Sequence, residues 1–376
     1  MKDIGIYIHI PFCKSKCFYC DFNSYKGLEH LYEDYKNAII NEISFNTIYD
    51  KEISSIYIGG GTPNVIPEDY ISQIMHILRE NFNIKNSCEI TIELNPGLIT
   101  ENKLVTYKKN GINRLSIGLQ AFQNRLLSKI GRIHTVEEFY DNYEMASKYF
   151  KNINIDLMYA LPGQSIKDWE ETLNNIIDIR PKHISCYGLI LEEGTTFYEL
   201  YKNNKIELLN EDIEMEMYHN AIKSLTKNGY IHYEISNFSL QGYECKHNIL
   251  YWKDRQYIGF GAGAHSYIDN KRYNNINNVS KYIDSINQKG KAIENEYILT
   301  KDDSMAEYMF LGLRMLEGIC DEDFKSRFST SLFDKYKDTI SKYTDYGLIE
   351  IFDGNCIRLT YKGIDLSNII FQEFLP

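Results

Sequence analysis

The chain has 376 residues, 43% of them hydrophobic and 25% charged, which is the composition of a globular protein with a sizeable core. This length favours two domains, or one barrel-like domain with a smaller appendage. A formal net charge of −11 argues against the phosphate backbone of a nucleic acid as the main partner.

No apolar run reaches the ~20 residues that a membrane-spanning helix needs. The opening segment MKDIGIYIHIPFC is too short and too polar for a signal peptide. We therefore expect a cytoplasmic protein, in which thiols stay reduced and clustered cysteines indicate a metal site or catalysis rather than disulfides.

Short apolar runs alternate with longer amphipathic runs over the first two-thirds of the chain. The predicted strands are Ile4–Ile10, Ile53–Ile58, Glu89–Leu94, Arg114–Leu119, Ile153–Leu157 and His183–Leu189. The predicted helices are Leu31–Thr47, Pro67–Asn81, Glu101–Lys109, Val136–Phe150 and Ile166–Ile179. This order predicts parallel βα units in an α/β fold, either doubly wound or barrel-like, with the ligand site at the carboxyl ends of the strands. Polar and glycine-rich residues do follow the first five strands, beginning with a cysteine-rich segment after the first and GGGTP (Gly59–Pro63) after the second.

After about residue 195 the pattern changes. The sequence predicts a helix over Glu211–Asn228, a strand and turn over Gly229–Phe238, and a loop with a short helix over Ile268–Gly290. Three further predicted helices are Ser304–Leu316, Asp323–Phe328 and Leu332–Tyr346. A hairpin of Leu348–Phe352 and Cys356–Leu359 follows, so this end of the chain is similar to a winged helix. Acidic residues outnumber basic ones there, which favours a helical cap over a DNA-binding domain. We expect three regions, 1–195, 196–300 and 301–376.

Three cysteines, Cys13, Cys17 and Cys20, form the one cluster in the sequence. The remaining five are scattered, and we expect each to be a small buried hydrophobic residue. They are Cys88, Cys186, Cys245, Cys320 and Cys356. The cluster fits a zinc site with His9 as a fourth ligand. Zinc cysteines usually come as two pairs on separate turns, however, and the spacing also fits a [4Fe–4S] cluster in which three thiolates leave one iron open to another ligand.

The CxxxCxxC spacing together with GGGTP resembles the radical S-adenosylmethionine superfamily. The resemblance implies a partial (β/α)6 barrel and a [4Fe–4S] cluster whose open iron binds the amino and carboxylate groups of S-adenosylmethionine, from which one electron makes a 5′-deoxyadenosyl radical. Further motifs, YxHIPFCxxxCxYC, ELNP, GLQAF, GRIH and DLMYALPGQ, resemble the oxygen-independent coproporphyrinogen III oxidase branch. Matched onto this chain, they imply S-adenosylmethionine contacts from Tyr7, Tyr19, Gly60, Gly61, Thr62, Glu93, Gln120, Arg132 and Asp156. The branch can hold a second S-adenosylmethionine, for which Gln120, Arg132 and Asp156 are candidates.

Two features depart from the oxidase and resemble the heme chaperone group of HemW type. Phe22 stands where the oxidase pattern has a fourth cysteine, and the motifs begin at Tyr7, so we expect no substrate-covering amino-terminal arm. The group also carries an HNxxYW motif, present here as His247, Asn248, Tyr251 and Trp252.

The HNxxYW motif implies heme as a ligand, with His247 as the axial ligand of its iron. Lone histidines beside aromatic residues are also common in packed cores, so a hydrogen-bonded core histidine is the second interpretation. Cys245, two residues earlier, is an alternative iron ligand.

The expected function is a heme chaperone that passes heme to heme-requiring respiratory proteins and retains the cluster and the S-adenosylmethionine site. We expect it to act in the cytoplasm or peripherally at a membrane, with a homodimer as one candidate assembly and no nucleic-acid partner. Whether it turns over as an enzyme stays open. The alternatives are a coproporphyrinogen III dehydrogenase and a radical methyltransferase that opens heme.

Overall fold

The computed structural model describes residues 3–46 and 51–376. Its centre is a twelve-stranded mixed sheet with the strand order β12-β11-β10-β9-β1-β2-β3-β4-β5-β6-β8-β7. The six consecutive parallel strands are β1 (Asp3–Ile10), β2 (Glu52–Gly60), β3 (Asn83–Leu94), β4 (Arg114–Gln120), β5 (Asn152–Tyr159) and β6 (His183–Gly188). This confirms the predicted α/β fold and its parallel units.

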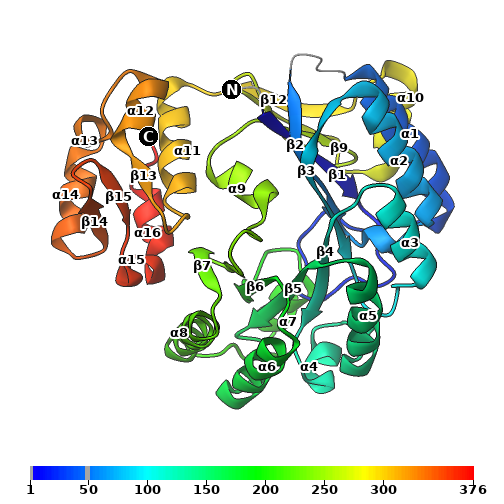
Figure 1. Ribbon diagram of the computed structural model, residues 1–376, viewed down its shortest axis with the longest axis horizontal. Coiled ribbons are helices and arrows are strands. Elements are labelled where there is room, and N and C mark those ends of the chain that lie inside the picture. The colour runs from blue at the N-terminus through cyan, green and yellow to red at the C-terminus, as the bar shows by residue number, and fades with distance from the viewer. Residues whose placement is uncertain (1–2, 47–50) are drawn as a thin grey trace.

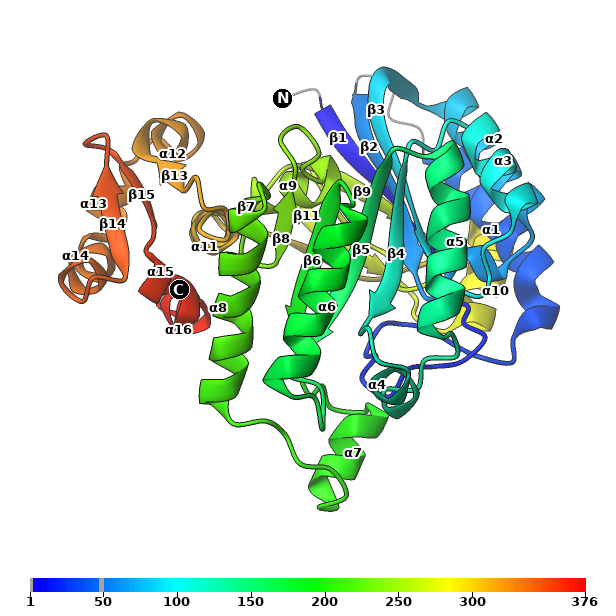
Figure 2. The same ribbon diagram turned by 60° about the horizontal axis from the view of Figure 1, so that its bottom comes forward.

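Helices cover the outer side of the curved sheet, as Figures 1 and 2 show. They are α1 (Tyr32–Phe45), α2 (Glu68–Asn81), α3 (Glu101–Lys109), α4 (Asn124–Lys129), α5 (Val136–Tyr149) and α6 (Ile166–Ile179), with the short 3-10 helices η1 (Glu29–Leu31) and η2 (Pro63–Val65). The predicted end of the first helix, Thr47, lies outside the described residues. The helix α4 has six residues and was not predicted, because so short an element shows no apolar periodicity.

Alternation along the strands separates the core from the functional face. In β1, Ile4, Ile6, Ile8 and Ile10 are fully buried in the main core. The residues between them, including Tyr7 and His9, point to the opposite face of the sheet because successive side chains alternate. The parallel sheet therefore buries its isoleucines on one face and presents polar side chains on the other.

The sheet continues beyond the six parallel strands at both edges. At one edge β9 (Tyr257–Phe260) runs parallel to β1, and β10 (His265–Ile268), β11 (Lys271–Asn275) and β12 (Ile293–Ile298) follow in antiparallel pairs. At the other edge lie β8 (Asn237–Ser239) and β7 (Ile231–Glu234). Helices α7 (Thr196–Lys202), α8 (Glu211–Lys227), α9 (Lys246–Trp252) and α10 (Val279–Lys289) belong to the same half of the chain.

The prediction of a loop with a short helix over Ile268–Gly290 was wrong. This stretch contains the strand β11 and the eleven-residue helix α10. Lys271–Asn275 is entirely polar apart from one tyrosine, so no apolar alternation marks it as a strand. Its strand conformation comes from antiparallel pairing with β10 and β12, a long-range contact that the local sequence does not carry.

A smaller domain follows the sheet, drawn in orange and red in Figure 1. Its elements are α11 (Lys301–Gly312), β13 (Ile319–Cys320), α12 (Asp321–Phe328), α13 (Leu332–Lys335), α14 (Lys337–Asp345), β14 (Ile349–Phe352), β15 (Cys356–Leu359), α15 (Tyr361–Asp365) and α16 (Ser367–Gln372). The predicted hairpin is present as β14 and β15, and β13 joins it in a three-stranded sheet. The helix predicted over Leu332–Tyr346 is divided in two at Tyr336, which adopts a non-helical conformation.

The expectation that Cys320 and Cys356 are isolated buried cysteines is corrected by the structure. The two form a disulfide with an S–S distance of 2.02 Å, and they face each other across β13 and β15. The two cysteines are 36 residues apart, so the sequence alone did not predict the bond; it follows from the pairing of the two strands. The other six cysteines are free thiols.

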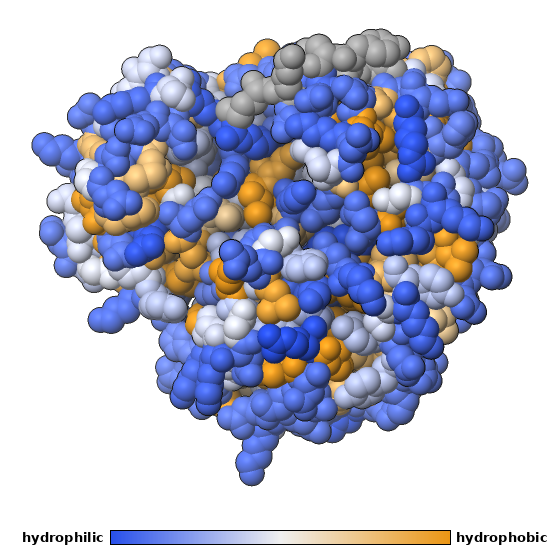
Figure 3. All heavy atoms as spheres, viewed as in Figure 1, coloured by the Kyte–Doolittle hydropathy of each residue, from blue (hydrophilic) through white to orange (hydrophobic). Residues whose placement is uncertain are grey.

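The surface seen in Figure 3 is mostly hydrophilic, with hydrophobic side chains gathered in its central part and over the smaller domain. Among residues 3–46 and 51–376, no helix has the length and hydrophobicity that a bilayer-spanning segment requires.

Candidate functional site

The three clustered cysteines lie on the loop that follows β1, at the carboxyl edge of the parallel strands. Cys13 is buried, and Cys17 and Cys20 are partly buried. The loop is pinned by backbone hydrogen bonds from the Cys13 N–H to the Tyr25 carbonyl, at 2.9 Å, and from the Tyr25 N–H to the Pro11 carbonyl, at 2.7 Å. The thiols are therefore presented by an ordered loop at the place where the strand-end rule puts a ligand.

Each thiol has a polar side chain beside its sulfur. The Thr62 hydroxyl donates to Cys13 Sγ at 3.5 Å, and Arg132 Nη1 donates to Cys17 Sγ at 3.7 Å. Cys20 Sγ lies 3.9 Å from the Ser24 hydroxyl. Burial raises the pKa of Cys13 and Cys20, so without a metal these two thiols are neutral at physiological pH. Donors aimed at sulfur favour the thiolate form, which is the form that binds iron.

His9, considered above as a fourth zinc ligand, has both ring nitrogens occupied. Nδ1 is hydrogen-bonded to the Tyr7 hydroxyl at 2.9 Å, and Nε2 donates to the Asn23 carbonyl at 2.8 Å. Burial lowers the pKa of His9 to about 4, so the ring is neutral. Its contacts make it a support for the loop that carries the cysteines.

The glycine run after β2 packs directly against the cysteine loop. A Cβ on Gly61 would lie 2.7 Å from the Phe12 carbonyl oxygen and 3.0 Å from Cys13 Sγ. Gly60 has a φ of +112°, and a Cβ there would lie 2.5 Å from the His9 ring. Only glycine allows this approach of two backbones, in which the Gly61 and Thr62 N–H groups donate to the Ile10 and Phe12 carbonyls at 2.9 and 2.8 Å.

Two partly buried carboxylates, Glu93 of β3 and Asp156 of β5, lie near the glycine run. Glu93 accepts hydrogen bonds from the Tyr57 hydroxyl at 2.9 Å and from the Gly60 N–H at 3.1 Å. Asp156 accepts from Ser116 at 3.1 Å and from Asn154 Nδ2 at 2.7 Å. Burial, and then the negative charge of Asp156, raise the pKa of Glu93 to about 7, and burial also raises the pKa of Asp156. A cationic ligand would stabilise both carboxylates in their ionised forms.

Arg132 lies between the cysteine loop and the end of β4. Its Nη2 donates to Asn95 Oδ1 at 2.7 Å and to the Gly118 carbonyl, while its Nε is buried without a hydrogen-bond partner among the described residues. Gln120, at the end of β4, has a φ of +74°, a left-handed conformation that only a few per cent of non-glycine residues adopt. An unsatisfied guanidinium nitrogen beside a cysteine-bound cluster fits a ligand carboxylate.

The two tyrosines predicted at this site also lie beside it. Tyr7 stacks on Tyr57, with ring centroids 6.4 Å apart, and Tyr19 packs against the second hydrophobic cluster beside the cysteine loop. Burial, and then the negative charge of Cys17, raise the pKa of the Tyr19 hydroxyl, which is therefore neutral. The structure thus brings together the cysteines, the glycine run and the predicted S-adenosylmethionine contacts.

These residues fit a [4Fe–4S] cluster with an open iron. Among residues 3–46 and 51–376, no three Cys, His, Asp or Glu side chains converge as ligands of a single ion. A cubane cluster instead takes each thiolate at a separate iron. The partly buried carboxylates and the unsatisfied Arg132 nitrogen supply opposite charges, which suit the ammonium and carboxylate groups of an amino-acid-bearing cofactor.

Sequence reasoning missed two residues of this site. Asn95 donates from Nδ2 to the Thr62 hydroxyl at 2.9 Å and accepts from Arg132, so it connects the glycine run to the arginine. The Tyr57 hydroxyl of β2 donates a hydrogen bond to Glu93 of the neighbouring strand β3. Asn95 follows a strand within the ELNP motif, which was a usable signal, whereas Tyr57 lies within β2 and its orientation becomes known only with the fold.

The HNxxYW segment forms α9, which packs across β1 and β2. His247 is 1% exposed, and both of its ring nitrogens are hydrogen-bonded: Nδ1 to the Ser55 hydroxyl at 2.9 Å and Nε2 to the Tyr251 hydroxyl at 2.8 Å. Burial lowers its pKa to about 3, so the imidazole is neutral. Asn248, Tyr251 and Trp252 are partly exposed. In this conformation, iron ligation by His247 requires one of its two hydrogen bonds to break.

Cys245, the alternative iron ligand, is fully buried at the start of α9. Its Sγ lies 3.7 Å from Glu89 Oε1, and burial raises the pKa of its thiol to about 12. The thiol is therefore neutral and enclosed, which is the environment expected for a small core residue.

Comparison with known proteins gives matches over the whole chain. The radical SAM superfamily model matches residues 7–176, and the HemN C-terminal domain model matches residues 299–366. The protein "Heme chaperone HemW" of Bacillus subtilis is 37% identical over 98% of this chain and 98% of its own length. The protein of the same name from Escherichia coli is 30% identical over 94% of this chain and 98% of its own length.

Among solved structures, coproporphyrinogen III oxidase (HemN) from Escherichia coli superposes with a TM-score of 0.86 at 24% identity, covering 99% of this chain and 90% of that chain. At that identity the likeness shows a shared fold. The radical SAM match implies a [4Fe–4S] cluster and S-adenosylmethionine. Cys13, Cys17 and Cys20 would hold such a cluster, and the chemistry it would supply is one electron for cleavage of the sulfonium carbon–sulfur bond.

Proposed function

This chain belongs to the HemW family of heme chaperones within the radical S-adenosylmethionine superfamily, and from that premise we propose that it binds heme and passes it to heme-requiring proteins. The observation that carries the proposal is the 37% identity to heme chaperones of two bacteria, Bacillus subtilis and Lactococcus lactis, over 98% and 100% of this chain. Phe22 adds support, because its side chain, 64% exposed, occupies the position of the fourth cysteine in the oxidase pattern.

The cluster ligands in this proposal are Cys13, Cys17 and Cys20. The S-adenosylmethionine contacts are Tyr7, Tyr19, Gly60, Gly61, Thr62, Glu93, Gln120, Arg132 and Asp156. The packing of the glycine run on Cys13 and the unpartnered nitrogen of Arg132 support this assignment. A second S-adenosylmethionine at Gln120, Arg132 and Asp156 is part of the proposal, and binding stoichiometry by calorimetry tests it.

The heme ligand in this proposal is His247, with Asn248, Tyr251 and Trp252 around the ring. Absorption titration of cluster-free protein with heme tests the function, and we expect about one heme per chain. His247→Ala should weaken binding by about tenfold or more, as expected for loss of an axial ligand. His183→Ala is the matched control, because His183 is also fully buried with both ring nitrogens hydrogen-bonded.

The outcomes separate the function from the ligand. A wild-type protein that binds no heme contradicts the proposed function. Unchanged affinity and spectrum in His247→Ala remove the ligand assignment alone. Equal losses in His247→Ala and His183→Ala indicate general destabilisation, which thermal unfolding of both variants measures directly.

A second candidate function is the oxidative decarboxylation of coproporphyrinogen III, which the shared fold with HemN favours. Anaerobic incubation with coproporphyrinogen III, S-adenosylmethionine and a reductant decides between the two. We expect no protoporphyrinogen IX above the level of a protein with all three cluster cysteines replaced by alanine.

We place the handover in the cytoplasm, with acceptors at the membrane surface. Flotation with anionic lipid vesicles tests the membrane contact.

We also propose a homodimer formed through β12, an edge strand that exposes Ile293, Tyr297 and Ile298. Sedimentation of the wild type against Ile298→Lys tests that assembly, since a charge on the edge should keep the protein monomeric.

A further inference from the structure

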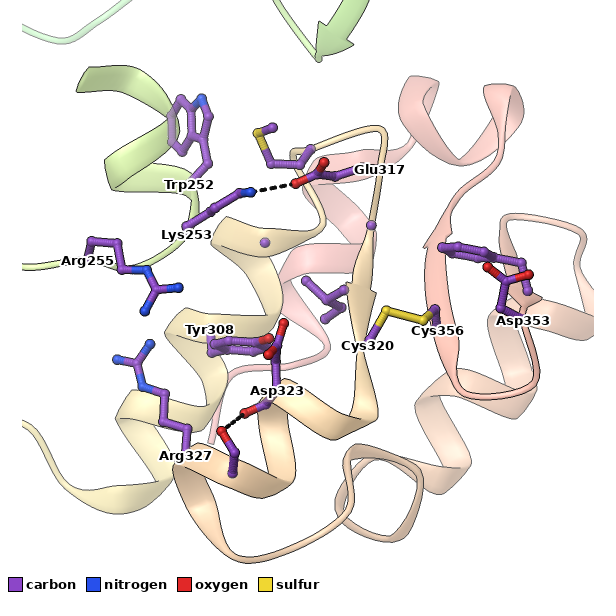
Figure 4. A pocket seen from close by; sticks show the side chains of 16 residues that line it. Trp252, Lys253, Arg255, Tyr308, Glu317, Cys320, Asp323, Arg327, Asp353 and Cys356 are labelled. Carbon is purple, nitrogen blue, oxygen red and sulfur yellow. Dashed lines mark hydrogen bonds and ion pairs between the residues drawn. A yellow bond between two sulfur atoms is a disulfide. The ribbon is translucent and has the colours of Figure 1, made fainter. Parts of the chain in front are cut away.

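A pocket of about 350 Å³ lies between the carboxyl end of α9 and the smaller domain. Trp252, Lys253 and Arg255 form one wall, as Figure 4 shows. The opposite wall comes from α11, β13, α12 and the β14–β15 hairpin, and it includes Tyr308, Arg327 and Phe352. The pocket thus begins at the last residue of the HNxxYW motif and lies outside the site of the cluster.

Two arginines at this pocket differ in how they are neutralised. Arg327 is ion-paired with the buried Asp254 and donates to the Tyr267 hydroxyl at 3.2 Å, so its guanidinium is fixed. Arg255 is partly exposed, and no carboxylate of residues 3–46 or 51–376 lies within ion-pair distance of it. Figure 4 shows the two guanidinium groups extending toward one another beside the Tyr308 ring. The charge of Arg255 is therefore the one that a ligand can neutralise, and its planar guanidinium matches a carboxylate.

The other charged side chains of the pocket leave Arg255 as its one cation without an ion-pair partner among residues 3–46 and 51–376. Lys253 is paired with Glu317 at 2.8 Å, so it adds no free charge. Asp353 lies on the far side of the Cys320–Cys356 disulfide, away from the arginines (Figure 4). Asp323 lies beside the Tyr308 hydroxyl on the inner side of the ring. Two carboxylates thus lie near the arginines: Asp254 is paired with Arg327, and Asp323 lies beside the Tyr308 ring.

Aromatic side chains complete the walls. Trp252, Tyr308 and Phe352 line the pocket, and Trp252 is held from behind by Arg314, whose guanidinium lies 4.5 Å from the centroid of the Trp252 ring. Burial, and then the charge of Asp323, raise the pKa of Tyr308 to about 12, so its hydroxyl is a neutral hydrogen-bond donor. Aromatic walls beside the Arg255 guanidinium suit a flat ligand that carries a carboxylate.

We propose that this pocket binds the propionate edge of heme, with Arg255 holding a carboxylate and Trp252 and Tyr308 bordering the ring. The inference rests on the proposed heme binding and adds to it a place for a carboxylate. It is independent of which residue ligates the iron. Pockets for small ligands commonly enclose ~300–1,000 Å³, so a pocket at the lower end takes one edge of the macrocycle.

The test uses cluster-free protein and two probes in the same detergent buffer, heme and heme dimethyl ester, which lacks the carboxylate charges. The wild type should bind heme about tenfold or more tightly than the ester. Arg255→Gln should lose about tenfold in heme affinity and bind the ester as the wild type does, while Arg255→Lys should recover part of the loss. Arg180→Gln is the control, because it removes the same charge at the exposed end of α6.

Each result has one reading. Equal heme affinity in Arg255→Gln and the wild type overturns the pocket assignment and leaves the proposed function standing. Equal affinity of the wild type for heme and for heme dimethyl ester also overturns the pocket assignment. Absence of heme binding by the wild type contradicts the proposed function itself.

Discussion

Single residues at the cofactor site determine how it responds to pH. Glu93 has a pKa of about 7 because of burial and the nearby charge of Asp156. Its folded-state pKa is raised, so the carboxyl is protonated as pH falls through about 7, and the attraction for a cationic cofactor is lost on the acidic side. For the same reason this group destabilises the fold as pH rises through that range.

We predict that the affinity of cluster-reconstituted protein for S-adenosylmethionine falls by about tenfold between about pH 8 and about pH 6. In Glu93→Gln the affinity should be lower at high pH and nearly independent of pH, because the titrating group is gone. Calorimetry at several pH values measures this. Glu144→Gln, on the exposed face of α5, should keep the wild-type profile, and a pH-dependent Glu93→Gln would refute the assignment.

A second residue-scale prediction concerns Gly61. A methyl group there meets the Phe12 carbonyl and Cys13 Sγ within 3.0 Å, so Gly61→Ala should displace the cysteine loop. We expect a marked loss of iron and sulfide per chain after anaerobic reconstitution. Gly229→Ala serves as a control for backbone strain, because Gly229 also has a positive φ but has no atom within 4 Å of the added Cβ. Equal cluster content in both variants would argue against the packing described here.

At the scale of elements, the disulfide connects two strands of the smaller domain. Because it closes a loop of 36 residues, breaking it with Cys356→Ser should lower the free energy of unfolding by ~2–4 kcal/mol. Labelling of unfolded, non-reduced, cluster-free protein should modify six of the eight cysteines. Eight labelled cysteines would show that the bond is absent, and a reductant should abolish the stability difference between wild type and variant.

Glu42, a buried carboxylate of α1, joins this helix by hydrogen bonds to α10, to β11 and to the loop after β9. Glu42 accepts hydrogen bonds from the Tyr282 hydroxyl at 2.6 Å, Asn275 Nδ2 at 2.6 Å and the Gly261 N–H at 2.9 Å. Tyr282→Phe removes one donor from a buried acceptor and should cost ~1–3 kcal/mol in chemical unfolding. Tyr361→Phe, at the exposed start of α15, should be neutral, and equal stabilities of the two variants would contradict this role for Glu42.

The same elements show what the sequence does and does not specify. The six parallel units were predictable because buried isoleucines and amphipathic helices carry strong local periodicity, and Glu101–Lys109 and Ile166–Ile179 agree with prediction at both ends. The strand β11 was not predictable from the sequence, because its side chains are polar and its conformation depends on pairing with neighbouring strands. The site followed from motifs at strand ends, whereas Tyr57 and the Cys320–Cys356 bond arise from residues brought together only by folding.

At the scale of the whole molecule, one scaffold supports two kinds of tetrapyrrole chemistry. The chain shares its fold with HemN and belongs to the family of the heme chaperones. The difference lies in local features, including Phe22 near the cluster loop and the HNxxYW helix that ends at the arginine-bearing pocket. We therefore propose that heme is recognised at α9 and the smaller domain, apart from the strand ends that carry the cysteines.

The most direct test of the central claim is a heme-transfer measurement. Protein loaded with one heme is mixed with increasing amounts of an apo b-type cytochrome, and the absorption of the acceptor is followed in time. We predict that heme moves to the acceptor at a rate that rises with acceptor concentration, as direct handover requires. A rate independent of acceptor concentration, or no transfer at all, would contradict the account.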